Sequence, residues 1–323
     1  MSALAEARRR LPAVSRGIPR EGVLLALLLV LVVVLAQLSP YFLTVSNILN
    51  TSRYFVETGL IALGMTMIIV TGGIDLSVGS ALALASVTLG FSYKAGVPLP
   101  LAIVAALLVG TACGTLNGFL VTRWDVHPLA ITLATQALFR GIAYAVTNLD
   151  AVSTFPNWFD DFGQFYLGPV PGQLLAFIVA ALLVWALLSF GRFGRHVYAL
   201  GVNEEAARFS GVPIWRTKTA VYAITGLLVG LAAVIYTSRV STARADAGLG
   251  LELGVIAAVV LGGASIYGGS GTIHGTVLGV VIIAILQQGL LLTSIDSNWI
   301  LVITGAVMVL GVFVNEFFRR QDE

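Results

Sequence analysis

The sequence predicts an all-α membrane protein with about ten transmembrane helices. Hydrophobic residues make up 58% of the 323 residues, charged residues make up only 11%, and the mean hydropathy is +0.95. Soluble domains carry about 25% charged residues, so this chain has too little polar surface to cover a soluble globule. The apolar residues also gather in stretches of about 20, the length that crosses a bilayer as a helix.

Ten such stretches can be drawn along the chain. The third and eighth begin in glycine-rich sequence, so each is expected to be either a continuous span or a broken, re-entrant one. The transmembrane domain is expected over residues 22–318, after a basic tail of residues 1–21 and before a short tail of residues 319–323. The expected spans are residues 22–38, 54–71, 74–93, 97–122, 128–148, 170–190, 216–237, 251–267, 272–293 and 298–315.

The basic residues between the spans predict which side each loop faces. With the N-terminus inside, the inner loops and tails hold 13 Lys and Arg residues, whereas the outer loops hold only Arg53, Lys94, Arg239 and Arg244. Cytoplasmic loops carry an excess of Lys and Arg. We therefore expect a multi-pass protein of a bacterial cytoplasmic membrane, with both termini in the cytoplasm.

The expected outer loop of residues 149–172 is acidic and aromatic. Two interpretations stay open: an aromatic belt at the membrane interface, or a surface that docks or gates something arriving from outside. The loop has three aspartates and no basic residue, and its aromatic residues are Phe155, Trp158, Phe159, Phe162, Phe165 and Tyr166.

Short sequence matches indicate an internal repeat, as in many transporters. An offset of 177 aligns residues 73–78 with 250–255 and crosses five segments, which predicts copies of opposite orientation. An offset of 190 aligns Gly72-Gly73 with Gly262-Gly263 and crosses six segments, which predicts parallel copies. A third match, of Asn117-Gly118 with Gln288-Gly289, again crosses five segments and favours the inverted repeat, although 35 glycines make chance matches easy.

Few ionisable side chains fall within the spans, where a charge is costly, and uncharged polar side chains are more plentiful there. Asp75, in the stretch from Thr71 to Ser80, has two open roles: it caps the following helix, or it lines a translocation path or gate. Arg140 is expected either to pair with an acid in the bundle or to extend to the interface. The candidate residues of a path or gate are Asp75, Ser77, Asn117, Thr132, Thr135, Gln136, Glu252 and Gln287.

The expected cytoplasmic loop of residues 191–218 contains a short helix. Asn203 is a good N-cap, Glu204 and Glu205 suit the first turn, and Gly211 with Pro213 ends the helix. A lone helix of about seven residues is marginal in water, so it packs either on its own membrane domain or on another protein.

Several chemistries lack a sequence signal. The chain has no Gly-x4-Gly-Lys-Ser/Thr phosphate loop, and its three histidines do not follow the spacing of a metal site. No metal ligands and no catalytic residues are therefore predicted. The net charge of +2 also gives no reason to expect nucleic acid as a partner.

Four motifs occur in the order found in one transporter family. They are Thr71–Ser80, Leu116–Gly118, Gly201–Arg208 with Ser210-Gly211, and Glu252–Gly271. Together they resemble the ribose/xylose/galactoside-type permeases of ABC sugar importers, and the resemblance runs from about residue 40 to residue 318.

The resemblance implies a bundle of the type II importer kind and a non-enzymatic subunit for a pentose or hexose. It implies four kinds of partner: a second permease copy or homologue, cytoplasmic subunits that bind ATP and Mg, an extracytoplasmic sugar-binding protein, and membrane lipid. By position, the short helix resembles the element that seats in the ATPase, with Asn203, Glu204, Glu205, Ala206, Arg208 and Phe209 as coupling residues. An ion-coupled secondary sugar transporter, with Asp75 or Glu252 as the ion carrier, remains the alternative.

Overall fold

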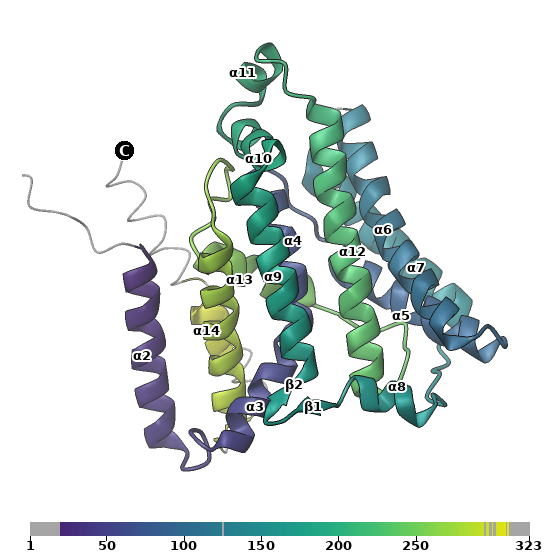
Figure 1. Ribbon diagram of the computed structural model, residues 1–323, viewed down its shortest axis with the longest axis vertical. Helices are drawn as coiled ribbons and strands as arrows, with labels where there is room; N and C mark the ends of the chain where they lie inside the picture. Colours follow the sequence, from purple (N-terminus) through teal and green to yellow (C-terminus); the bar gives the residue numbers. More distant parts are fainter. Residues whose placement is uncertain are drawn as a thin grey trace, which may run out of the picture.

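The computed structural model describes residues 20–124, 126–293, 295–296, 299, 302–307 and 309 (Figure 1). This part of the chain is helical apart from one two-stranded hairpin and the connecting segments. Its labelled elements are α2 (Arg20–Leu38), α3 (Val45–Tyr54), α4 (Val56–Val70), α5 (Val78–Lys94), α6 (Leu99–Arg123), α7 (Pro128–Thr147), α8 (Asn157–Phe162), β1 (Tyr166–Leu167), β2 (Val170–Pro171), α9 (Gly172–Phe190), α10 (Arg192–Val202), α11 (Glu204–Phe209), α12 (Ile214–Val240), α13 (Leu251–Leu261) and α14 (Ile273–Leu291).

Five of the described helices are long and apolar enough to cross a membrane, namely α6, α7, α9, α12 and α14. The helices α3 and α4 meet at Phe55 with a bend of 47° and count as a sixth span if they are taken together. The expected number of ten spans is therefore not confirmed. The tenth expected segment, residues 298–315, lies mostly outside the described residues.

The eighth expected segment is shorter than predicted. The helix α13 has 11 residues, which at 1.5 Å per residue reach only about 16 Å, half of a hydrocarbon core. It ends because Gly263 adopts a left-handed backbone conformation, with φ of 93°. A side chain on the preceding Gly262 would overlap with the Gly275 carbonyl of α14, so a glycine here allows α14 to pack closely against the end of α13.

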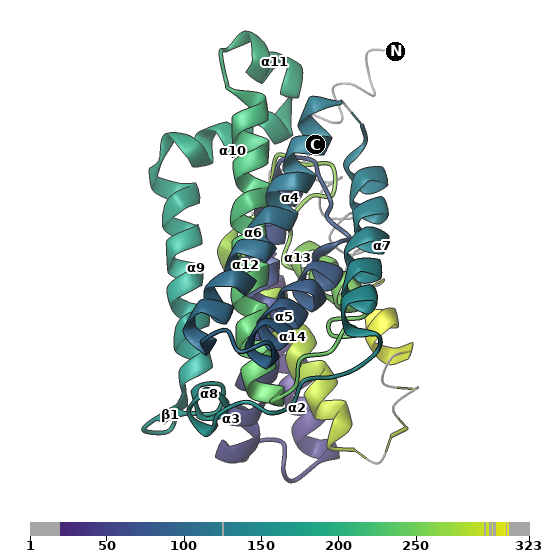
Figure 2. The ribbon, with the colours of Figure 1, turned by 90° about the vertical axis from the view of Figure 1, so that its right-hand side faces the viewer.

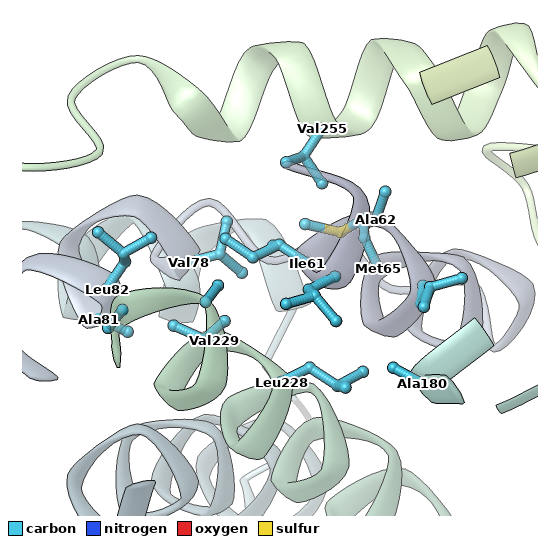
Figure 3. Close-up of a cluster of buried hydrophobic side chains, with 14 of the residues drawn as sticks. Ile61, Ala62, Met65, Val78, Ala81, Leu82, Ala180, Leu228, Val229 and Val255 are labelled. Carbon is cyan, nitrogen blue, oxygen red and sulfur yellow. The ribbon is translucent and has the colours of Figure 1, made fainter. Parts of the chain in front are cut away.

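The core of the bundle surrounds α4, in which only Thr58 is not buried. Figure 3 shows Ile61, Ala62 and Met65 of this helix packed among side chains from α5, α9, α12 and α13. Beside this core, α6 and α12 approach closely because Gly110 and Gly114 face Gly226 and Gly230. Small residues four apart allow such close contact between membrane helices.

The bundle has two distinct ends. In Figures 1 and 2, α10 and α11 lie at the top, whereas α3, α8 and the β1–β2 hairpin lie at the bottom. We call these the α11 end and the α8 end. The expected loop of residues 191–218 thus contains two helices, and the amphipathic α10 was not predicted.

The predicted aromatic loop forms α8 and the hairpin at the α8 end. Its aromatic residues divide into two groups: Phe155 and Phe159 are buried, whereas the other four are exposed. The hydroxyl of Ser238 donates to the Phe159 carbonyl and so attaches α8 to the end of α12. The loop therefore closes the core with one part and presents aromatic side chains with the other.

Candidate functional site

The turn between α4 and α5 is organised by Asp75, which is only 3% exposed. Its Oδ1 accepts hydrogen bonds from the backbone N–H of Ser77 at 2.8 Å and from the Ser77 hydroxyl at 2.7 Å. Ser77 is the N-cap residue of α5 but makes no side-chain cap bond itself. The carboxylate of Asp75 thus satisfies backbone and hydroxyl donors at the start of this helix.

Two neighbouring elements complete this polar cluster. The amide Nδ2 of Asn117, on α6, donates to Ser77 Oγ at 2.7 Å and to Asp75 Oδ2 at 3.2 Å. The hydroxyl of Thr132, on α7, donates to the Ile74 carbonyl at 3.1 Å. The structure therefore brings four of the predicted path residues together around one turn: Asp75, Ser77, Asn117 and Thr132.

Two buried oxygen atoms of this region have no hydrogen-bond partner among the described residues. They are Asn117 Oδ1 and the hydroxyl of Tyr222, on α12. The Tyr222 hydroxyl lies 2.9 Å from the point where a side chain on Gly73 would begin, so it faces the same turn. Buried polar atoms are normally paired, so these two have unused hydrogen-bonding capacity beside the turn. Tyr222 was not predicted, because a tyrosine in an apolar span has no distinct sequence signal.

A second cluster lies where the N-terminus of α13 meets that of α5. The Oε1 atom of Glu252 accepts a hydrogen bond from Gln136 Nε2 of α7 at 3.0 Å. A side chain on Gly79 would begin 2.5 Å from Glu252 Oε2 and would overlap with the Gly248 carbonyl. Only a glycine at residue 79 permits this approach of the two helix ends.

The extended segment before α13 is held on both sides. The guanidinium of Arg140 donates to the carbonyls of Ala245 at 2.5 Å and Ala247 at 2.8 Å. The backbone of Ala243 pairs with that of Val152. Arg140 therefore bonds backbone carbonyls inside the bundle, instead of an acid or the interface as expected.

Two predicted path residues stand apart from these clusters. Thr135 is buried on α7, but its hydroxyl donates to the Thr132 carbonyl of the same helix. Gln287 is exposed on α14, a helix that does not contribute to either cluster. Sequence alone could not separate them from the others, because the side of a helix that meets the cluster depends on packing.

At the α11 end, a hollow of about 970 Å³ opens beside the first cluster. Its walls come from the Thr71-Gly72 turn, the end of α6, the start of α7, the end of α10, and α11 with the segment that follows it. The hollow thus reaches Thr71 and Gly72, which precede the turn at Asp75, but the four clustered residues are not among those that line it.

The helix α11 projects from this end (Figures 1 and 2), and both of its termini are capped. Asn203 Oδ1 accepts from the Ala206 N–H at 2.8 Å, as predicted for an N-cap. Glu204 forms an ion pair with Lys218 at 2.5 Å. Ala207 is buried, whereas Phe209 is 85% exposed and Glu205 and Arg208 are exposed as well. The helix is therefore anchored through its first turn and Ala207 and leaves Glu205, Arg208 and Phe209 exposed, an arrangement that suits a helix that docks on another protein.

Comparisons with known proteins match most of the chain. Residues 47–312 match the family described as "Branched-chain amino acid transport system / permease component". The "Autoinducer 2 import system permease protein LsrD" of Escherichia coli (strain K12) and that of Shigella flexneri are each 38% identical over 298 residues, which is 90% of this chain and 90% of each relative. The protein of the same name from Salmonella paratyphi B is 37% identical over the same lengths.

Proposed function

Since this chain belongs to the permease family of ABC importers, we propose that it forms the translocation path for a monosaccharide of the pentose or hexose class. It acts with a second copy or a homologous permease, with cytoplasmic subunits that bind ATP and Mg, and with an extracytoplasmic sugar-binding protein. The chain itself is a transport subunit and not an enzyme. The comparisons give no support to the ion-coupled alternative.

The helix α11 is the observation that carries the proposal. It has six residues, too few to be stable alone, yet it is capped and anchored through Ala207 and the Glu204–Lys218 pair. Its apolar Phe209 is 85% exposed. Aromatic side chains that enter a partner's pocket often dominate binding energy, so we assign this surface to the ATPase.

The polar clusters are the proposed path and gate. Both lie at the N-terminus of a helix that follows a non-helical stretch, and each contains one buried acid, Asp75 or Glu252. The offset of 177 aligns these two stretches. Their contact through Gly79 and Gly248 supports an inverted repeat of α4–α5 and α12–α13, with hydroxyl and amide groups that can bind a sugar without trapping it.

The proposed orientation places the α11 end in the cytoplasm and both termini with it. Basic residues support this: the α11 end carries Arg123, Arg192, Arg195, Arg208, Arg216 and Lys218, whereas Arg53, Lys94, Arg239 and Arg244 lie toward the α8 end. The bias follows the positive-inside rule. A cysteine placed at residue 205 should then react with an impermeant thiol reagent only after the cytoplasmic side is exposed.

Reconstitution tests the proposed energy source. We expect the chain alone in liposomes to move no sugar. We expect the complete assembly to accumulate sugar only when ATP is present on the side of the bilayer that the α11 end faces. Uptake by the chain alone under a proton or sodium gradient would contradict the proposal and restore the ion-coupled alternative.

The relatives suggest a second candidate substrate. Their names assign them to import of autoinducer 2, and they cover nearly the whole of this chain. Uptake of labelled monosaccharides and removal of autoinducer 2 from the medium should therefore be measured with the same assembled importer. Removal of autoinducer 2 without uptake of any monosaccharide would select the second candidate.

A further inference from the structure

An apolar groove of about 460 Å³ runs between α9 and α14 on the outside of the bundle. These helices lie side by side, with α10 above them, in Figure 1. Among the residues that line the groove, His274 is the only one with a titratable side chain. The outward-facing Ile178 and Leu182 on α9 are 42% and 56% exposed, so the groove opens toward the surrounding lipid.

Edge-to-face ring contacts lie between the groove and α10, and positive charge follows them in the chain. The ring of Trp185 lies 5.9 Å from that of His274 and 5.1 Å from that of Phe190. Gly191 then leads directly into α10, whose Arg192 and Arg195 are both exposed. The Tyr198 hydroxyl donates to the Gly271 carbonyl at 2.8 Å, which holds α10 against the segment that precedes α14.

Among the described residues, no acidic side chain pairs with this charge. The helices α9, α10 and α14 contain no Asp or Glu, and neither Arg192 nor Arg195 forms an ion pair with any described residue. The positive charge at the end of the groove is therefore available to an anion that lies at the level of the lipid headgroups.

We propose that this groove binds one anionic phospholipid, with an acyl chain between α9 and α14 and the phosphate at Arg192, Arg195 and His274. The apolar walls alone cannot select a lipid, because lipid tails are as apolar as the side chains. Selection must come from the headgroup, and basic pockets between membrane helices bind anionic headgroups. The site does not depend on which substrate the chain transports.

Trp185 provides a reporter inside the groove. The remaining tryptophans, Trp124, Trp158, Trp215 and Trp299, are replaced with Phe, and the full chain is placed in nanodiscs. Brominated phosphatidylglycerol or brominated phosphatidylcholine is then titrated while Trp185 fluorescence is recorded. We expect the affinity for phosphatidylglycerol, measured by quenching, to be about 25-fold higher than that for phosphatidylcholine. The reason is that each of the two arginines near the membrane surface contributes about fivefold, or about 1 kcal/mol.

Matched variants separate the headgroup from the groove. Arg192→Gln with Arg195→Gln should reduce the affinity for phosphatidylglycerol to that for phosphatidylcholine. Arg123→Gln with Arg216→Gln removes the same charge at the same end, away from the groove, and should leave the preference intact. Ala181→Phe should fill the groove and weaken quenching by both lipids.

Three outcomes would overturn the proposal. Equal quenching by the two lipids in the parent would show that no anionic lipid is selected. An unchanged preference in the Arg192/Arg195 variant would place the selecting charge elsewhere. Unchanged quenching by both lipids in the Ala181→Phe variant would show that the acyl chain does not lie in the groove.

Discussion

Replacement of Phe209 by alanine should separate folding of this chain from its assembly with the ATPase. Phe209 is 85% exposed at the end of α11, so its removal should change the stability of the chain by less than about 0.5 kcal/mol, as is usual for surface positions. Full burial of a phenylalanine in a partner's pocket stabilises a complex by about 1.5–3 kcal/mol. The dissociation constant should therefore rise by between about tenfold and a hundredfold.

The assay is direct measurement of binding between the purified chain in nanodiscs and the ATP-binding subunit of its importer, with substrate-stimulated ATP hydrolysis as a second readout. Trp124→Ala is the matched control, because Trp124 is 62% exposed at the same end of the bundle but lies at the end of α6. The control should bind as the parent does.

Charge reversal on the same helix gives an independent check. Glu204→Arg with Glu205→Arg places two positive charges at the positive end of the helix dipole. Because Glu204 also pairs with Lys218, the single change Glu205→Arg isolates the effect on the partner. We expect assembly to fall at least about tenfold, or about 1.4 kcal/mol, in the double variant. If Phe209→Ala and the double variant both assemble and hydrolyse ATP like the parent, α11 is not the coupling helix.

Three further predictions concern the interior of the bundle. Asp75→Asn should retain most transport, since Asn caps about as well as Asp; an assembled but inactive variant in the uptake assay would show that the charge itself is needed. Gly79→Ala should lower the free energy of unfolding by about 1–3 kcal/mol in thermal or denaturant unfolding, because its Cβ would overlap with the Gly248 carbonyl, whereas Gly254→Ala, with open space around it, should not. Glu57 is 3% exposed and lies 2.7 Å from Arg239, so Arg239→Met leaves an unpaired buried carboxylate and should lower the free energy of unfolding by about 3–5 kcal/mol. Adding Glu57→Gln to the same chain should recover part of this stability, and no recovery would rule out the buried charge as the cause.

Much of the helical architecture follows from apolar patterning. Each of the first nine expected segments contains a helix, because long apolar stretches satisfy their backbone only as helices in lipid. The eighth segment was left open as continuous or broken, and the length of α13 could not be predicted because the positive φ of Gly263 that follows it has no distinct sequence signal. The helix α10 was missed because its three charged or histidine side chains and its flanking Gly191 and Asn203 are typical of a loop.

The candidate site was predictable in residue type but not in geometry. Polar side chains in an apolar chain are conspicuous, and Asp75, Ser77 and Asn117 were identified for that reason. Their contact joins residues about 40 positions apart, which no local pattern encodes. Gln287 has the same chemistry as Gln136 but lies on an exposed side of its helix, and only the packing of the bundle separates them.

The helix α7 joins the two polar clusters into one hydrogen-bonded unit. Thr132, Gln136 and Arg140 are spaced four residues apart and so lie along one stripe of the helix. They bond, in order, the turn before α5, the acid of α13 and the extended segment before α13. A shift of α7 along its axis would displace all three contacts together. The turn at Asp75 and the half-length helix at Glu252 therefore cannot move independently unless these bonds break.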